Sequence, residues 1–343
     1  MIPTIQVDPG SKTPLYKQLL HQFETAIHDG SLVTGELLPS MNDLSASTGI
    51  SKETVKKTYG LLREKRLIVP KQGKGFYVAD LSADARPQVL VLFDKLSIYK
   101  QILYNSFAER LGDRADLTVL MHNQNLDLFE YYLDTYLDQF DYYVITPHFP
   151  LDAPSQQRAV KLISRIPNPK LILVDRLQPG YAGNFGAVYQ DFENDIYYGL
   201  TQGLDRRMET SALKVITLPT SLYGSHIRKG IERFCTEHAV PVEFLTGVPD
   251  NVAKGETYII LNSQLDAGLV DLTRRIQAQG LRIGGDVRII SYNEFDMNEL
   301  VLGGLTTVST DFQQMGRLAA DMILDKRLSK VHCDFRMTRR NTF

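Results

Sequence analysis

Residues 38–62 decide the fold of the N-terminal part of the chain, and they read LPSMNDLSASTGISKETVKKTYGLL. Ser40 can cap a helix together with Asp43, three residues further on, because a serine hydroxyl accepts a hydrogen bond from a free backbone N–H at a helix start. Gly49 interrupts this helix, and Ser51 is placed to cap a second one. The stretch therefore predicts two short helices joined by a tight turn.

The second helix has two chemically different faces. Val55, Tyr59 and Leu62 recur at helical spacing and form its apolar face. Between residues 51 and 75 the chain has eight Lys or Arg against two Glu, a local charge of +6 in a chain of net charge −2. A basic face of this kind suits phosphate groups, although many charged helix faces are simply solvated. The face opposite the apolar one carries Lys52, Glu53, Lys56 and Lys57.

Two short apolar runs, residues 67–69 and 76–78, follow the second helix. Between them, residues 70–75 read PKQGKG, a glycine-rich turn with basic residues at its tip. Apolar runs around a glycine-containing turn predict a β-hairpin. A hairpin with this charge can lie along a groove of DNA.

The order of these parts resembles the winged helix-turn-helix of the GntR family, over roughly residues 10–80. The matching strings are Pro14-Leu15-Tyr16, Gly35-x-x-Leu38-Pro39-Ser40, Ser51 to Lys56 and Gln72 to Gly75. In that family, the start of the recognition helix and the wing tip contact the operator. The resemblance therefore implies double-stranded operator DNA as a partner. The DNA-binding candidates are Ser40, Asn42, Ser51, Lys52, Glu53, Thr54, Lys56, Lys57, Lys71, Gln72, Gly73 and Lys74.

Three positions depart from the family's usual pattern. The family often has Arg where this chain has Asn42, and it favours Arg at the positions of Lys52 and Lys56. Arg reads guanine through a bidentate fork, whereas Lys does so less rigidly. The operator sequence therefore cannot be carried over from the family, although phosphate attraction needs only the charge.

Length and composition predict a two-domain protein that stays in the cytoplasm. The chain has 343 residues, of which 43% are hydrophobic and 23% charged. No apolar run approaches the roughly 20 residues of a membrane span, and the first residues resemble no signal peptide. Cys235 and Cys333 have no metal-ligand spacing, and we expect two buried reduced thiols. We expect residues 1–79 to form the DNA-binding domain, 80–87 a linker, and 88–343 an effector-binding and dimerisation domain.

From residue 88 onward, apolar runs alternate with helical patterns. Alternation of this kind predicts a parallel, doubly wound sheet. The pattern starts again near residue 192, which predicts an α/β domain of two similar lobes with a cleft between them. The expected strands are 89–93, 117–120, 142–145, 171–174, 213–217, 242–245, 258–261 and 287–290. The expected helices are 98–111, 126–139, 155–166, 192–208, 224–237 and 265–279.

Polar and aromatic residues follow the expected strands. Ligands in open α/β sheets bind outside the carboxyl ends of strands, so these residues are expected to line the cleft. Asp, Asn and Arg side chains can bind sugar hydroxyls, and a flat aromatic ring can cover the C–H face of a sugar ring. For any single residue, a role in a cap or turn is the main alternative. The residues are 94–95, 122–123, 146–149, 175–176, 219–223, 262–263 and 292–294.

The second part of the chain resembles the effector domain of the LacI/GalR regulators, over roughly residues 87–340. The strings are Leu173-Val174-Asp175-Arg176, GLRIGGDVRIISYN at 280–293, and Leu305-Thr306-Thr307-Val308 followed by Met315-Gly316-x-x-Ala319-Ala320. This resemblance implies the type I periplasmic-binding-protein fold and a small-molecule effector. The effector-binding candidates are Asp94, Tyr99, His148, Asp175, Arg176, Tyr223, Arg228, Asn262, Asn293 and Glu294.

The effector motifs are partly altered. Asn262 stands at the family's Asn, but Ser263 or Gln264 replaces the following Asp, and Asn293 replaces a later Asp. Arg228 precedes the next glycine by two positions where the family has three, so His226 or Tyr223 could serve in its place. These changes leave the identity of the effector open.

A GntR-type head on a LacI-type effector domain is the arrangement of the arabinose-responsive repressors. The resemblance implies a homodimeric, sugar-responsive regulator of a sugar-utilisation operon, most simply a repressor. L-arabinose, L-fucose or a related monosaccharide would close the cleft and thereby release the two DNA-binding heads from the operator or retune them on it.

Two other functions remain open from the sequence. The second domain could only dimerise, or it could sense a metabolite that is not a sugar, because its Asp and Arg positions are altered. A sugar-processing enzyme is disfavoured because the chain has no nucleophile elbow, no phosphate-binding Gly-rich loop and no His-Glu-x-x-His string. We therefore expect no catalytic residues, no metal site and no cofactor.

Overall fold

A computed structural model describes residues 5, 7–8, 10–11, 13–65, 67–71, 73–79, 86–203, 211–217, 222–261 and 267–343. The chain divides into two compact units, residues 1–87 and 88–343. Most of the expected linker, residues 80–85, lies outside the described residues. Within the described residues, every helix is too short or too polar to cross a bilayer.

The first unit is the winged helix-turn-helix that the sequence predicts. Ser40 caps the second helix by accepting a hydrogen bond from the backbone N–H of Asp43 at 3.1 Å, and Ser51 caps the third through Thr54 at 3.3 Å. Gly49 ends the second helix in the left-handed conformation, with φ 71°. The elements are α1 (Leu15–His28), α2 (Met41–Thr48), α3 (Lys52–Glu64), β1 (Ile68–Lys71) and β2 (Gly75–Val78).

The second unit consists of two α/β lobes, each built on a six-stranded sheet of the described residues. The first sheet has the order β13-β7-β6-β5-β3-β4 and is parallel throughout. Its strands are β3 (Gln88–Phe93), β4 (Asp116–Met121), β5 (Tyr142–Ile145), β6 (Leu171–Asp175), β7 (Gly186–Tyr189) and β13 (Lys330–His332). Its helices are α4 (Ile98–Leu111), α5 (Leu126–Tyr136), α6 (Ala153–Ile163) and α10 (Phe312–Leu324).

The second sheet has the order β14-β12-β11-β10-β8-β9 and is parallel except for β14, which runs antiparallel to β12. Its strands are β8 (Ala212–Ile216), β9 (Val242–Leu245), β10 (Glu256–Ile260), β11 (Arg288–Tyr292), β12 (Thr306–Thr310) and β14 (Phe335–Thr338). Its helices are α7 (Phe192–Gly203), α8 (Gly224–Glu237) and α9 (Ala267–Ala278). The predicted two-lobed, doubly wound fold is confirmed.

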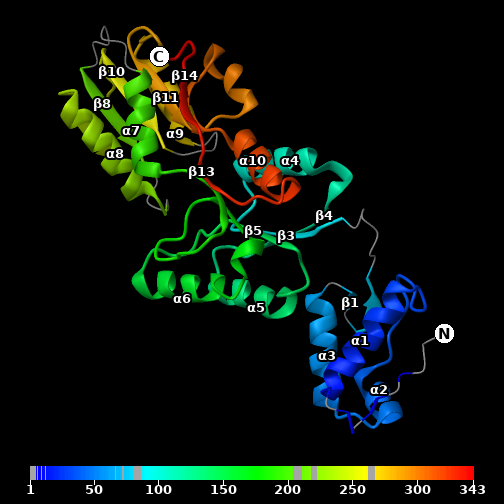
Figure 1. Ribbon diagram of the computed structural model, residues 1–343. Helices are drawn as coiled ribbons and strands as arrows, with labels where there is room; N and C mark the ends of the chain where they lie inside the picture. The colour runs from blue at the N-terminus through cyan, green and yellow to red at the C-terminus, as the bar shows by residue number, and fades with distance from the viewer. Residues whose placement is uncertain are drawn as a thin grey trace. The chain divides into compact units, whose positions relative to one another are not determined.

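Alternate residues of β3 face the two helical layers of the first lobe. Val89 and Val91 pack among the side chains of α4 and α10, whereas Leu90 and Leu92 pack among those of α5 and α6. Figure 1 shows the two pairs of helices on opposite sides of this sheet. The continuous apolar run of β3 is explained by this burial on both faces.

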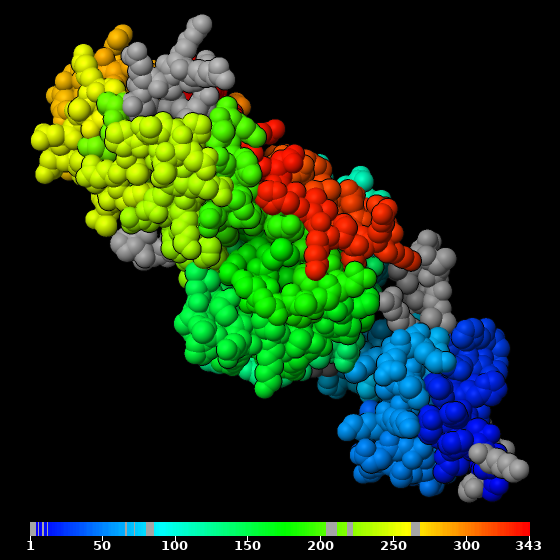
Figure 2. All heavy atoms as spheres, turned by 60° about the vertical axis from the view of Figure 1, so that its left-hand side comes forward, coloured from blue at the N-terminus to red at the C-terminus, as the bar shows by residue number. Residues whose placement is uncertain are grey.

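The sequence analysis expected one lobe to follow the other along the chain. In the structure, each lobe instead contains segments from both parts of the chain. After β12 the chain returns to the first lobe as α10 and β13, and it then ends in the second lobe with β14. Figure 2 shows this orange and red segment spanning the two lobes. Three chain segments therefore connect the lobes, at residues 190–191, 311 and 333–334. Cys235 and Cys333 are both free and buried, as expected.

Candidate functional site

The helix α3 presents a basic face to solvent. Val55, Tyr59 and Leu62 are buried, whereas Lys52 and Lys56 are exposed and have no charged partner among the described residues. This division follows from the amphipathic spacing, because the apolar stripe faces the core of the unit. The two amines therefore remain free for phosphates or bases.

The other candidates of the first unit lie around this face. Lys57 lies over the ring of Tyr16, with 3.8 Å from Nζ to the ring centroid, and Lys71 lies over Tyr77 at 4.4 Å. Gly73, at the tip of the hairpin, has φ 70°. The exposed candidates include Asn42, Ser51, Glu53, Gly73 and Lys74, and Thr54 is half-buried. Ser40 uses its hydroxyl in the cap of α2, and Gln72 lies outside the described residues.

In the second unit, the ends of three neighbouring strands bring charged residues together. Asp94 follows β3, His148 lies three residues after β5, and Asp175 is the last residue of β6. All three are buried. Thr146 fixes Asp94, because its hydroxyl accepts a bond from the Asp94 N–H at 2.7 Å and donates to Asp94 Oδ1 at 3.0 Å.

Lys100 joins this cluster from α4, and the sequence analysis did not select it. Its Nζ donates a hydrogen bond to Asp175 Oδ2 and lies 3.3 Å from Asp94 Oδ1. Burial lowers the pKa of Lys100, but the two carboxylates outweigh that effect and raise it above its ordinary value. Burial likewise opposes the ionisation of Asp175, but Lys100 and His148 hold its pKa far below the ordinary value. One ammonium group therefore keeps two buried carboxylates charged.

Tyr223, at the start of α8, connects the second lobe to this cluster. Its hydroxyl lies 2.7 Å from His148 Nδ1 and accepts a hydrogen bond from Arg176 at 3.2 Å. Its ring stacks on Phe192 at 4.3 Å, with an interplanar angle of 8°. Because His148 Nε2 lies 2.8 Å from Asp175 Oδ2, a chain of polar contacts runs from Arg176 through Tyr223 of the second lobe and back through His148 to Asp175.

The chain was compared with known families and proteins. Residues 15–78 match the family model of bacterial regulatory proteins of the gntR family, and residues 218–334 match a periplasmic binding protein-like domain. The chain joins a GntR-type DNA-binding domain to a periplasmic-binding-protein-like domain. This combination confirms the resemblance inferred from the sequence, but the comparisons assign no arabinose specificity.

The chain is also similar to known regulators, over part or most of its length. The repressor YtrA of Bacillus subtilis is 33% identical over 76 residues, which are 22% of this chain and 58% of YtrA. The regulator GalR of Streptococcus thermophilus is 22% identical over 332 residues, covering 85% of this chain and 93% of GalR. The solved trehalose repressor of Escherichia coli has a TM-score of 0.58 at 13% identity, over 74% of this chain and 100% of that chain. A dimeric lac repressor has a TM-score of 0.57 at 17% identity, over 74% of this chain and 98% of that chain. At such identities the solved structures show the fold alone.

Two effector candidates of the periplasmic-binding-protein-like domain, Arg228 and Tyr99, make contacts away from the charged cluster. Arg228 is on the exposed side of α8, where it pairs with Glu232 at 2.7 Å and lies over the ring of Phe244. Tyr99 is part of the core and its ring packs against Phe312 at 5.4 Å. The sequence analysis selected Arg228 by its resemblance to the family's Arg motif and left His226 and Tyr223 as alternatives. Both Arg228 and Tyr99 remain candidates, with these other contacts in the structure.

The remaining candidates lie at the end of β11 or outside the described residues. Asn293 adopts φ 75°, and its Oδ1 is buried with no hydrogen-bond partner among the described residues. Glu294 is engaged by Arg340, with contacts of 2.9 and 3.2 Å, and by the hydroxyl of Thr307. Asn262 lies outside the described residues, as do residues 219–221 and 263.

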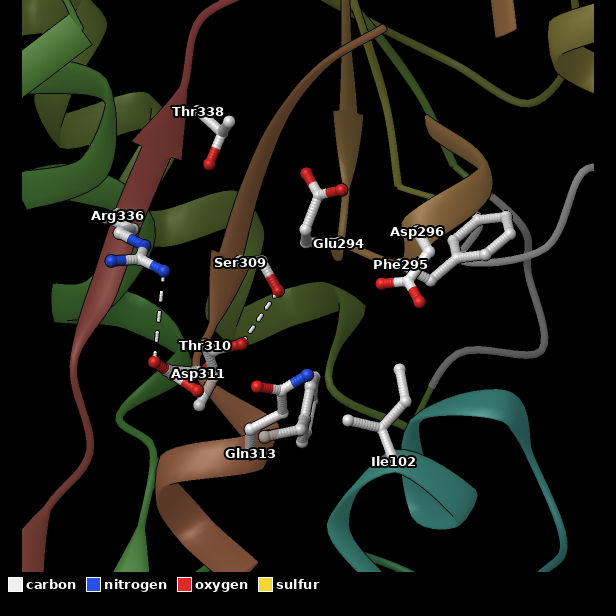
Figure 3. Close-up of a pocket in the computed structure, with 11 residues that line it drawn as sticks. Ile102, Glu294, Phe295, Asp296, Ser309, Thr310, Asp311, Gln313, Arg336 and Thr338 are labelled. Carbon is white, nitrogen blue, oxygen red and sulfur yellow. Dashed lines mark hydrogen bonds and ion pairs between the residues drawn. The ribbon is translucent and has the colours of Figure 1, made fainter. Parts of the chain in front are cut away.

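A cavity of about 150 Å³ lies beside this end of the second sheet. Figure 3 shows the carboxylates of Glu294 and Asp296 at one side of it and the guanidinium of Arg336 at another. Arg336 is 3.9 Å from Asp311, whose side chain also caps α10. The lining comes from both lobes: Ile102, Phe312 and Gln313 from the first, and Glu294, Phe295, Asp296, Ser309, Thr310, Arg336 and Thr338 from the second, with Asp311 in the connection between them.

Proposed function

We propose that this protein is a transcriptional regulator, most simply a repressor, that binds operator DNA through its first unit and a monosaccharide through its second. The observation that carries the proposal is the joining of a GntR-type domain with free lysines on α3 to a domain whose lobes meet at a polar network. The effector is L-arabinose, L-fucose or a related small sugar. Such a regulator acts in the cytoplasm, where its DNA is.

The proposed active form is a homodimer. The edge strand β4 exposes Val119 and Met121 to solvent, and Leu96 is 74% exposed just before α4. An exposed apolar edge of a sheet is a ready surface for a second copy. A dimer would hold two DNA-binding units at a half-site spacing, and sugar-dependent closure of the lobes would change that spacing.

Binding of sugars and DNA by the full-length protein tests this function. Thermal stability is measured against a panel of monosaccharides, because a ligand at 100 times its Kd stabilises the bound form by about 2.7 kcal/mol. DNA sites are then selected from a randomised pool, and their affinity is measured with and without the stabilising sugar. A sugar that stabilises the protein and changes DNA affinity is the expected result. DNA binding that no sugar alters would contradict the sugar-sensing role.

A variant separates DNA contact from other effects of charge. Lys52→Ala removes a free amine at the start of α3, so DNA affinity should fall and base preference should change, roughly 1–3 kcal/mol for a base contact. Lys229→Ala removes an exposed amine from α8 in the other unit and is the matched control. Equal affinities of the two variants would argue against α3 as the recognition helix.

A second candidate function is supported by Lys100. Because Lys100 already pairs with both Asp94 and Asp175, the cluster is stable without a sugar. The second unit could then serve only for dimerisation, or it could bind a metabolite that is not a sugar. Failure of every sugar in the panel, together with intact DNA binding, would favour this candidate.

A further inference from the structure

Arg176 is a nearly buried cation with no carboxylate partner. The residue is 9% exposed, and its guanidinium donates one hydrogen bond, to the hydroxyl of Tyr223. It also lies over the ring of Tyr223, 4.9 Å from the centroid. Among the described residues, no carboxylate oxygen lies within ion-pair distance of it. Arg has five N–H donors, so most of them lack an acceptor among the described residues.

The carboxylates nearby are already engaged. Asp175 accepts from Gln190 at Oδ1 and from Lys100 and His148 at Oδ2. The charges of Asp94, Asp175, Lys100 and Arg176 sum to zero. Lys100 pairs with both carboxylates, whereas Arg176 pairs with neither. Among the described residues, Arg176 therefore has more unpaired hydrogen-bond donors than Asp175 has free acceptor positions.

Tyr292 adds a second unsatisfied donor. Its hydroxyl is buried at the end of β11 and has no hydrogen-bond partner in the described chain. Burial raises its pKa, and the charges of Asp195 and Asp175 raise it further, so the hydroxyl keeps its proton. Buried polar groups are normally satisfied, so this hydroxyl is available to a ligand that accepts hydrogen bonds.

We propose that the effector carries an anionic group, a carboxylate or a phosphate, which pairs with Arg176. The proposal rests on the effector-binding function above, but it replaces the neutral sugars named there with an acid or phosphate derivative of a small sugar. The planar guanidinium can bind two oxygens of such a group at once, and this pairing compensates the buried charge. The sugar body would contact the amide of Asn293, whose Oδ1 has no partner among the described residues.

Matched ligand pairs test the proposal on the full-length protein. Binding is measured by calorimetry for L-arabinose and L-arabinonate, and for D-glucose, D-gluconate, D-glucuronate and D-glucose 6-phosphate, at constant ionic strength. D-galactose, D-galacturonate and D-galactose 6-phosphate form a third set. Inorganic phosphate and acetate are the controls for a bare anion. We expect an acid or a phosphate to bind at least about tenfold more tightly than its neutral partner.

Variants of Arg176 assign the preference to its guanidinium. Arg176→Gln should abolish the difference between charged and neutral ligands, and Arg176→Lys should retain part of it because the charge remains. The matched control is Arg165→Gln, since Arg165 pairs with Asp134 on the outer surface of the first lobe. Circular dichroism of each variant monitors folding, and the wild-type panel decides the question if Arg176→Gln does not fold.

The outcomes separate this inference from the proposed function. Tighter binding of a carboxylate or of a phosphate derivative supports the inference and identifies which group is recognised. A neutral sugar that binds as tightly as its acid overturns the inference and leaves sugar sensing intact. Inorganic phosphate binding as tightly as any sugar derivative also overturns it, because the site would then recognise an anion alone. Absence of binding by every ligand overturns both.

Discussion

Replacement of Lys100 by Met would measure how much the ammonium group of Lys100 contributes to the free energy of unfolding of the second unit. Methionine keeps most of the apolar stem of lysine and removes the charge. The side chains of Lys100, Asp94 and Asp175 are 5%, 3% and 7% exposed. Removing one partner from a buried ion pair costs roughly 3–5 kcal/mol, because the remaining charge is left uncompensated. We expect a loss of this size in the free energy of unfolding at pH 7.

The loss should depend on pH with a defined sign. In the wild-type protein the pKa of Asp175 is lowered, so its stabilising contribution is present above the unfolded pKa and is lost as the pH falls below it. In Lys100→Met, burial of Asp94 and Asp175 without the ammonium raises their pKa above the unfolded value of about 4. The carboxylates then destabilise the variant increasingly as the pH rises above 4. The difference between the two proteins should therefore shrink between pH 7 and pH 4.5.

Urea unfolding followed by circular dichroism measures this difference, because the chain contains no Trp for fluorescence. Lys161→Met removes an exposed amine of α6 and should change stability by less than about 0.5 kcal/mol. The double variant Lys100→Met, Asp175→Asn should recover part of the loss, since one of the two carboxylates no longer needs a partner. If the free energy of unfolding fell by less than about 1 kcal/mol at pH 7, or by the same amount at pH 4.5, Lys100 would not be the charge partner that stabilises Asp94 and Asp175.

Two further predictions concern the packing and the connections of the lobes. Gly316→Ala should destabilise the second unit by roughly 1–3 kcal/mol, because its Cβ would lie 2.3 Å from the backbone oxygen of Leu103 on α4. Gly247→Ala has open space around its Cβ and is the control in urea unfolding. Burial raises the pKa of Asp195 to about 6 despite its contact with His332 at 2.7 Å, so its contribution to stability falls as the pH rises from 4 to 6. Asp195→Asn should remove that fall, about 3 kcal/mol at most, and unchanged pH profiles of the urea midpoint would contradict this assignment.

Local elements could be predicted closely from the sequence, because short-range patterns determine them. The helix predicted at 98–111 and the strands predicted at 142–145 and 242–245 occur with those bounds. Their signals, capping residues and apolar periodicity, lie within the elements themselves. By contrast, the sequence analysis assigned no helix or strand to the residues of β7 or to those after residue 292. The strand β7 is as short as β5 and β9, but it begins at Gly186, and glycine is disfavoured in strands, so its apolar pattern is weaker than theirs.

The exchange of segments between the lobes could not be predicted from local patterns. Nothing in the sequence of α10 says which sheet it covers, because its apolar face would suit either lobe. The close contact between α10 and α4 depends on Gly316, which leaves room for the backbone near Leu103 and Phe107. A glycine between helix-forming residues is a visible signal, but its partner lies more than 200 residues away.

The charged cluster was predicted in part. The rule that ligands bind at the carboxyl ends of parallel strands selected Asp94, His148 and Asp175, which the structure brings together. The same rule missed Lys100, because a lysine in the first turn of a helix is ordinarily exposed. Its burial follows from the two carboxylates, and only the pairing of strands in space reveals that they lie close together.

The cluster is connected directly to the segments that join the lobes. Gln190 follows β7 at one connection, and its amide donates to Asp175 Oδ1. The side-chain oxygen Oε1 of Gln190 accepts a hydrogen bond from the hydroxyl of Thr310 at 2.9 Å. Thr310 is at the end of β12, where a second connection begins. A ligand that shifts Asp175 would perturb the contacts of Gln190 with both connecting segments. In a regulator whose lobes close around an effector, Gln190 is therefore a contiguous contact between the charged cluster and both connections, and a change in effector response on its replacement is what would show that the two are coupled.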